Sequence, residues 1–310
     1  MNQRSIPATD VWRQQRPMNP ERAGLPPVDW PNQQHSRIVS AGARWHVQRA
    51  GKGPAILLLH GTGSSTHTWD QVFKTLAEAN DVLAVDLPGH GFSSALPSGR
   101  TRLDGISTAL AGLLQAVDFK PDVIVGHSAG AAIALQLVLH DLTSPAAVVG
   151  INAALQPFGG TLAALFAPLA RSMTLVPFLP KLIARRARNI DVIDRMLRST
   201  GSDLPEQNVT RYQQLLIREQ HVAATLQMMA DWDLRTLLDD IEPLAAQTYL
   251  MVADGDEAVP PQQTTAVKKR YPDVTVKTMS GVGHLANEER PDLTAAYVAA
   301  VLRQERSGGR

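Results

Sequence analysis

The sequence predicts an α/β fold with a mainly parallel central sheet and helices on both faces. Three observations predict it. Short apolar runs, too short for helices and typical of strands buried on both faces, recur along the 310-residue chain. They alternate with segments of helical hydrophobic spacing. A Gly-x-Ser-x-Gly pattern stands at one of the strand-to-helix junctions.

The elements follow in order. Residues 1–35 are polar and proline-rich, and we expect an N-terminal arm with Trp12 and Trp30 as its large anchors. Residues 37–51 alternate about a glycine-containing turn, which is a hairpin signal. Buried strands are predicted at 55–61, 82–89, 123–128, 146–152, 248–255 and 274–281. Helices are predicted near 66–79, at 101–119, directly after residue 128, near 261–270 and near 291–304.

The alternation breaks between about Ala153 and Asp240, where helical stretches are separated by prolines. We therefore predict a helical cap at 153–240, inserted after the fourth buried strand, and a single core made of 36–152 and 241–310. Such a cap should lie at the carboxyl ends of the strands, where open α/β sheets bind their ligands.

Composition excludes several classes of protein. Thirty Lys and Arg against 29 Asp and Glu argue against a nucleic-acid-binding domain, which is usually strongly basic. The absence of cysteine excludes disulfides, thiolate nucleophiles and zinc sites built from cysteine. No apolar run is long enough to span a membrane, and the N-terminus has no signal-peptide pattern, so a cytoplasmic protein is expected. The nine histidines show no metal-binding spacing, and we expect neither metal nor cofactor.

The strongest chemical signal is the motif Gly-His-Ser-Ala-Gly at 126–130, with a buried strand before it and a small-residue helix after it. In this setting a sharp turn holds the serine hydroxyl out above the sheet edge, and the glycines relieve the crowding of the backbone. Ser128 is therefore the predicted nucleophile.

A serine hydroxyl needs a base that is itself oriented by an acid, in the chain order Ser, acid, His. Of the downstream histidines, His140 lies too far along its helix and His221 lies in the insert. His284 follows a predicted strand and is the candidate base.

The acid should also follow a strand. The turn after strand 248–255 offers Asp254, Asp256 and Glu257. We choose Asp256, because Asp254 lies where a turn is capped and because Asn152, at the other suitable strand end, carries no charge.

An oxyanion hole requires two backbone N–H donors. Ala129, directly after the nucleophile, should supply one. The loop His-Gly-Thr-Gly at 60–63 should supply the other, through Thr62. This loop has neither of the common nucleotide-binding glycine patterns, and His90 in the next loop is interpreted as structural.

The insert mixes large apolar residues with seven cations and two acids over 165–198. It could roof an apolar pocket, attract an anionic substrate or a membrane surface, or be an ordinary amphipathic cap with a solvated charged face. Met228, Met229 and Trp232 are candidate pocket residues, although such spacing is also common in simple packing.

The segments HGTGSSTHTW, DLPGHGFS, VGHSAGAA and GVGHLANEE resemble the α/β-hydrolase superfamily across residues 36–304. WPNQQHSRIVSAGARWHVQRAG, NAALQPFGG, MMADWDL and DGDEAVPP further resemble the magnesium-chelatase accessory proteins of bacteriochlorophyll biosynthesis (the BchO type). The resemblance implies a cytoplasmic protein acting near insertion of Mg²⁺ into protoporphyrin IX, with Ser128, Asp256 and His284 as its triad.

Three functions follow as hypotheses. The first is a serine hydrolase that cleaves an apolar ester, for which a tetrapyrrole ester is one candidate. The second is a non-catalytic porphyrin-binding partner of magnesium chelatase, and the third is a lyase or cofactor-free oxygen reaction on the same fold. A serine at residue 128 argues against haloalkane dehalogenase and epoxide hydrolase chemistry, which needs a carboxylate nucleophile.

Overall fold

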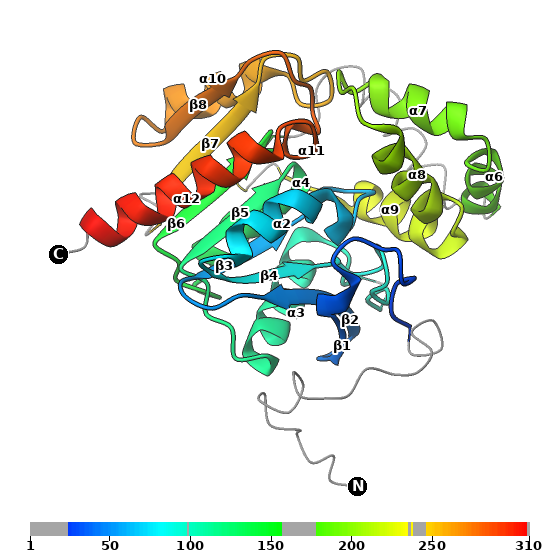
Figure 1. Cartoon of the computed structure of the whole chain (residues 1–310), viewed down its shortest axis with the longest axis horizontal. Coiled ribbons are helices and arrows are strands. Elements are labelled where there is room, and N and C mark those ends of the chain that lie inside the picture. Colours follow the sequence, from blue (N-terminus) through cyan, green and yellow to red (C-terminus); the bar gives the residue numbers. More distant parts are fainter. Residues whose placement is uncertain (1–23, 98, 157–177, 235–236, 238–245, 309–310) are drawn as a thin grey trace, which may run out of the picture.

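The computed structural model describes residues 24–97, 99–156, 178–234, 237 and 246–308. Across these residues eight strands form one sheet in the order β1-β2-β4-β3-β5-β6-β7-β8 (Figure 1). From β4 to β8 every pairing is parallel, whereas β2 runs antiparallel to both β1 and β4. The predicted mainly parallel sheet is confirmed. The strands are β1 Ser36–Ser40, β2 Arg44–Ala50, β3 Ala55–Leu59, β4 Asp81–Val85, β5 Val123–His127, β6 Ala147–Ile151, β7 Gln247–Ala253 and β8 Thr275–Met279.

Helices cover both faces of the sheet, and alternate strand residues face each layer. On β3, Leu57 and Leu59 pack with α3, α4 and α10, whereas Ile56 and Leu58 pack with α2 and α12. Because side chains alternate along a strand, burial on both faces requires the continuous apolar runs seen in the sequence. These helices are α2 Asp70–Ala77, α3 Leu103–Ala116, α4 Ala129–Leu139, α10 Pro261–Arg270 and α12 Pro291–Gly308.

The structure refines the predicted elements at three places. The helix expected near 66–79 begins as a 3₁₀ turn, η2 Thr66–Trp69, and continues as α2. Two short helices were not predicted, η1 Gln33–His35 and α11 Ala286–Glu289. Each is about one turn long, which is too short to show a helical hydrophobic period.

In the part of the cap that the structure describes, four helices lie between β6 and β7 in sequence and beside the core in space (Figure 1). They enclose a small apolar core of their own, which also takes in Leu285 from the loop after β8. Those parts of the expected arm and cap that fall in 1–23, 157–177 and 238–245 lie outside the described residues. No helix in the described ranges is both long and apolar enough to cross a bilayer. The cap helices are α6 Leu179–Arg186, α7 Ile190–Arg198, α8 Glu206–Leu216 and α9 Glu219–Asp231.

Candidate active site

Ser128 forms the sharp turn between the end of β5 and the start of α4, with φ 51° and ψ −116°. This backbone conformation is unfavourable for a residue with a side chain and costs about 1–3 kcal/mol. The flanking glycines are required by contact: a Cβ on Gly126 would lie 2.4 Å from the Ala131 nitrogen, and one on Gly130 would lie 2.3 Å from the Leu59 oxygen. Strand and helix therefore meet so closely that only glycine fits at the two positions flanking the turn.

Asp256 and His284 are brought together by the loops after β7 and β8. Asp256 Oδ2 lies 2.8 Å from His284 Nδ1, and both side chains are buried or nearly so. The other carboxylate oxygen, Oδ1, accepts hydrogen bonds from the amides of Ala258 and Val259, both at 2.8 Å. Because a carboxylate can only accept, His284 presents a protonated Nδ1 to Asp256 and keeps Nε2 free as a base.

No hydrogen bond joins Ser128 and His284 in this structure. The ring of His127, the neighbour of Ser128, is centred 4.8 Å from the ring of His284. Ser128 is 8% exposed and His284 is 9% exposed, so both are largely shielded from solvent. Catalytic hydrogen bonds of this kind are often long in unliganded enzymes and tighten when substrate binds.

The glycine-rich loop 60–63 lies against the nucleophile turn. A Cβ on Gly61 would be 3.0 Å from the Cβ of Ser128. The amides of Thr62 and Ala129 donate to no described residue. Ala129 is the first residue of α4, where helix geometry leaves the N–H without a partner. Both predicted donors are thus available to an acceptor beside Ser128.

Buried histidines hold the glycine-rich loop in place, a role that the sequence did not indicate. His60 Nδ1 donates to the Gly61 carbonyl at 2.7 Å, while its Nε2 accepts from the Leu87 amide at 2.9 Å. His221, from cap helix α9, accepts from the Gly91 amide at 3.1 Å and lies 3.2 Å from the Gly63 carbonyl. Burial lowers the pKa of His60 and, more strongly, that of His221, so both are neutral around pH 7.

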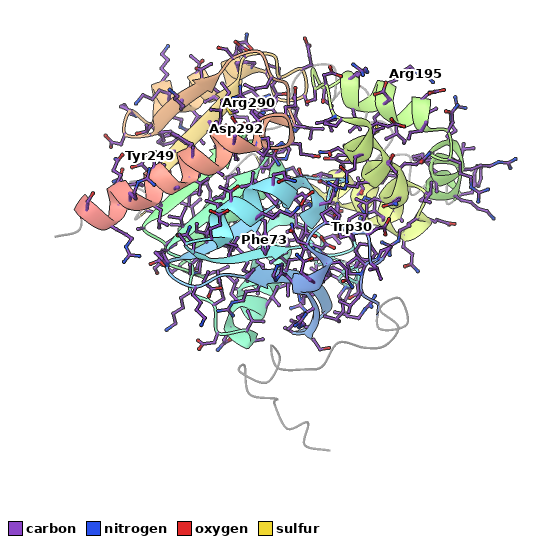
Figure 2. The ribbon with its side chains drawn as sticks, viewed as in Figure 1. Trp30, Phe73, Arg195, Tyr249, Arg290 and Asp292 are labelled. Atoms are coloured by element: carbon purple, nitrogen blue, oxygen red, sulfur yellow. The ribbon has the colours of Figure 1, made fainter. Side chains whose placement is uncertain are left out.

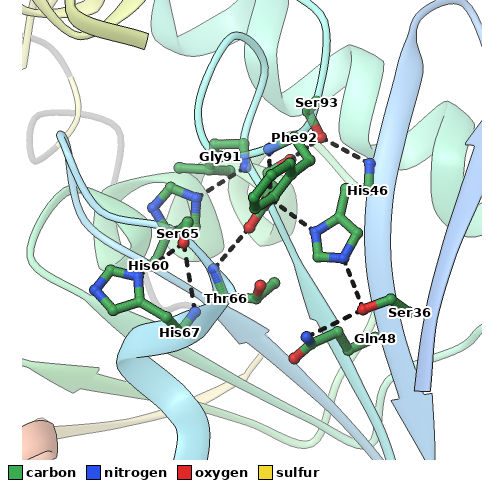
Figure 3. A network of polar contacts seen from close by, with 12 residues as sticks. Ser36, His46, Gln48, His60, Ser65, Thr66, His67, Gly91, Phe92 and Ser93 are labelled. Carbon is green, nitrogen blue, oxygen red and sulfur yellow. Dashed lines mark hydrogen bonds and ion pairs between the residues drawn. The ribbon is translucent and has the colours of Figure 1, made fainter. Parts of the chain in front are cut away.

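A buried carboxylate links this loop to the sheet (Figure 3). Asp86, at the end of β4, accepts from the Thr66 amide at 2.7 Å, from the Phe92 amide at 2.8 Å and from His46 Nδ1 at 2.7 Å. Although burial disfavours the charged form, His46 and these donors hold the pKa of Asp86 well below its usual range. The carboxylate therefore stays ionised and ties together the loops after β3 and β4.

Asn152 and His127 hold the carbonyl group of His284. Asn152 Nδ2 donates to it at 2.8 Å, and His127 Nε2 lies 2.8 Å away. Asn152 Oδ1 also accepts from the Ala253 amide at 2.8 Å, so this residue joins β6, β7 and the histidine loop. From the sequence alone, Asn152 stands only as a strand end that lacks an acid. A polar residue directly after a buried strand was the signal that could have identified it.

The candidate pocket residues lie on the last turn of α9 and just beyond it. Met228 is buried in the main core, and its sulfur lies 3.8 Å from Thr62 Oγ1. Met229 is half-buried. Trp232 is half-buried against the same core, and its indole N–H has no partner within the described structure. Met228 therefore contacts the predicted oxyanion loop directly. Among the described residues no group of His, Asp and Glu could hold a metal ion.

Comparison with known proteins is consistent with this architecture. Residues 56–297 match the family described as the alpha/beta hydrolase family. The chain is 35% identical to the magnesium-chelatase 30 kDa subunit of Rhodobacter capsulatus, over 86% of this chain and 94% of that protein. It is 27% identical to the pimeloyl-[acyl-carrier protein] methyl ester esterase of Nitrosospira multiformis, over 83% and 97% respectively. In fold it resembles an alpha/beta hydrolase fold protein from Burkholderia ambifaria, with a TM-score of 0.71, 20% identity, and coverage of 85% of this chain and 99% of that one.

Proposed function

The chain belongs to the alpha/beta hydrolase family, and from this premise we propose that it is a serine hydrolase that cleaves an ester bond. The observation that carries the proposal is the 2.8 Å contact between Asp256 and His284, and the strained turn at Ser128 supports it. The likeness to a methyl ester esterase supports the ester bond as the target.

The mechanism follows from the donors and acceptors of the site. Ser128 Oγ attacks the carbonyl carbon while its proton passes to His284 Nε2, and Asp256 stabilises the imidazolium that forms. The Thr62 and Ala129 amides donate to the oxyanion of the tetrahedral intermediate. His284 then protonates the departing alkoxide, and a water molecule, deprotonated by the same nitrogen, hydrolyses the acyl-enzyme and restores Ser128.

A fluorophosphonate probe tests this chemistry directly. We expect covalent labelling of the wild-type protein at Ser128, located by peptide mass spectrometry. The Ser128→Ala variant should show no labelling. If folded wild-type protein fails to label across a range of pH, the serine hydrolase proposal is wrong.

For the substrate we propose an apolar ester, with a tetrapyrrole ester as the leading candidate, and a place near magnesium chelation in the cytoplasm. The support is the similarity to the protein named magnesium-chelatase 30 kDa subunit and the apolar residues Met228, Met229 and Trp232 at the end of α9. Hydrolysis of a porphyrin methyl ester, compared with that of a simple short-chain ester, measures this preference. Equal kcat/KM for both substrates would argue against a tetrapyrrole.

A second candidate is a porphyrin-binding accessory protein of the chelatase, which the name of the Rhodobacter relative favours. The two functions separate in one experiment, complementation of a deletion strain with Ser128→Ala while pigment intermediates are measured. Loss of function supports catalysis. Full complementation, with porphyrin binding retained in the purified variant, supports the accessory role.

We also propose that the cap makes peripheral contact with an anionic membrane surface through α6. Phe178 (67% exposed) and Leu182 (50% exposed) lie four residues apart on the same side of this helix. The exposed cations of this region pair with no described acid. Apolar side chains ringed by cations suit an anionic lipid surface. Arg195, on α7, lies at the outer side of the same cap (Figure 2). The exposed cations that pair with no described acid are Lys181, Arg185, Arg186, Arg188 and Arg195.

Vesicle co-sedimentation tests this contact. We expect binding to vesicles that contain phosphatidylglycerol and little binding to pure phosphatidylcholine. The double variant Phe178→Ser/Leu182→Ser should bind more weakly, whereas Leu142→Ser, at an exposed apolar residue of the core, is the matched control. Equal binding by both variants would contradict a role for α6.

A further inference from the structure

The linker between cap helices α7 and α8 contacts both loops that carry the acid and the base. The carbonyl of Thr200 accepts from the amide of Glu257 at 3.1 Å and from the amide of His284 at 3.2 Å. Ser202 Oγ accepts from the amide of Leu285 at 2.8 Å. Three amides from the two loops therefore donate to a segment of the cap, which we call the cap linker (residues 200–202).

The cap linker fits between these loops without space for side chains. Gly201 has φ 83°, and a Cβ on it would lie 1.9 Å from the carbonyl oxygen of Gly255. A Cβ on Gly283 would lie 2.2 Å from the carbonyl carbon of Gly201. Glycines from the cap, the acid loop and the histidine loop thus meet at one point, and only glycine permits such an approach.

Two further contacts strengthen the attachment. Leu285, the residue after His284, is buried in the apolar core of the cap. Glu289 accepts from the Gly283 amide at 2.9 Å with one oxygen and lies 3.3 Å from the Asp203 amide with the other. The histidine loop is therefore anchored to the cap by packing as well as by hydrogen bonds.

The backbone of His284 is consequently held from two sides by different parts of the molecule. Its carbonyl is held by Asn152 and His127, which belong to the sheet core. Its amide is held by Thr200, which belongs to the cap. The direction of the imidazole ring follows from the backbone that carries it, so both parts of the molecule set the position of Nε2.

We propose that the cap linker is a positioning element for Asp256 and His284, so that the pair is aligned on Ser128 only while the cap is seated. This proposal rests on the proposed function for the role of the aligned pair. Thr200 fixes the spacing of the two loops, and Ser202 fixes the loop directly after His284. Any ligand or surface that displaces the cap would then change the rate of catalysis as well as access to the site.

The test compares Ser202→Ala, which removes one acceptor without adding atoms, with Ser199→Ala. Ser199 lies in the same connection but is exposed and donates only to Met196 in the cap. We expect kcat for an ester substrate to fall about tenfold in Ser202→Ala, because a small displacement of the His284 loop misaligns the base, with KM changed little. Ser199→Ala should behave as wild type, and thermal melts should show both variants folded.

A second measurement does not depend on activity. A protonated Nδ1 bonded to a carboxylate gives a downfield imidazole N–H resonance in proton NMR, which a His284→Gln variant assigns. We expect this resonance to weaken or shift in Ser202→Ala and to stay unchanged in Ser199→Ala. If the wild-type protein shows the resonance but labels with no serine probe, the proposed function fails while the positioning proposal is still judged by the resonance.

Three outcomes would overturn the positioning proposal. The first is an unchanged resonance together with an unchanged kcat in Ser202→Ala. The second is the absence of the resonance in the wild-type protein, because the proposal requires an aligned pair. The third is a rise in KM with unchanged kcat in Ser202→Ala, since that pattern indicates altered substrate binding rather than altered alignment.

Discussion

The hydrogen-bond partners of Asp256 fix the orientation of its carboxylate. Oδ1 faces two backbone amides and Oδ2 faces His284, so the carboxylate cannot rotate without losing three hydrogen bonds. The amides supply two donors that an asparagine could satisfy only with its carbonyl oxygen. Its amide nitrogen would then point toward His284.

This geometry predicts the effect of Asp256→Asn. The asparagine nitrogen would donate to His284 Nδ1, which would force the proton onto Nε2 and remove the base. We expect the rate of fluorophosphonate labelling to fall by about 10³- to 10⁴-fold, the size of effect known for such a change of tautomer. The control is Asp254→Asn, whose exposed side chain accepts from the Gly281 amide outside the pair. A less than tenfold loss would show that Asp256 does not orient the base.

Among elements, the junction of β5 and α4 is the most constrained. Gly126 and Gly130 each face backbone atoms closer than 2.5 Å from where a Cβ would lie. Adding even one methyl group therefore forces strand and helix apart, and the packing of this buried junction has no free space to absorb the shift. The motif is a condition for the fold at this point as well as for the chemistry.

Alanine substitutions measure that constraint. Gly126→Ala should lower the free energy of unfolding by more than about 2 kcal/mol, through overpacking of the strand–helix contact. Gly112, at an exposed position of helix α3, has nothing near a Cβ, so Gly112→Ala should instead raise stability by about 0.5–1 kcal/mol. Urea denaturation compares the two. Equal effects would mean that the close contacts at Gly126 relax at little cost.

Across the whole molecule, neutral buried histidines couple stability to pH. Burial lowers the pKa of His67, His90 and His127 to about 3. In the unfolded chain these residues bind protons near pH 6.5, whereas in the folded protein they do not until about pH 3. Their contribution is therefore fully present above pH 6.5 and is lost as the pH falls toward 3.

We expect the free energy of unfolding to fall over this interval by up to about 1.4 kcal/mol per pH unit for each such histidine. Burial raises the pKa of Glu288, so its contribution to stability increases as the pH falls, opposite to that of the histidines. The contribution of one histidine is therefore best measured as the difference between a variant and a control. The ring of His67 packs on Tyr212 of α8. In His67→Gln, the pH dependence of the free energy of unfolding should correspond to about one proton fewer taken up on unfolding. The control is His140→Gln, at the exposed end of α4, which should keep the wild-type pH dependence. Identical slopes, measured by urea denaturation between pH 6.5 and 4.5, would contradict this account.

Several polar contacts join the cap to the core, and some of them involve the buried titratable groups. Arg211 of α8 pairs with Asp70 at 3.0 Å, and Tyr212 donates to the buried Glu288 at 2.6 Å. His221 of α9 contacts the glycine-rich loop, and the cap linker contacts the acid and histidine loops. The cap therefore contacts the site at two places, the glycine-rich loop and the loops that carry Asp256 and His284.

Local patterns in the chain were sufficient to predict the buried strands along the chain, the strand-to-helix turn at Ser128 and the position of Asp256 and His284 in loops that follow strands. The physical reason is that burial of both faces of a strand requires a continuous apolar run, and that the carboxyl ends of parallel strands converge on one edge. Any polar residue just after such a strand is brought to that edge. The helices η1 and α11 are only about one turn long and show no hydrophobic period, so they could not be predicted.

Only the tertiary structure revealed what holds those residues in place. The Thr200 carbonyl lies 84 residues from His284, and His221 lies 158 residues from Gly63, in segments whose composition resembles ordinary cap packing. Backbone carbonyls carry no residue-type signal, and a buried neutral histidine in a helix has the same letter as an exposed one. Which atoms bond is decided by how the cap packs on the core, because hydrogen bonds between distant segments depend on three-dimensional distance rather than on spacing along the chain.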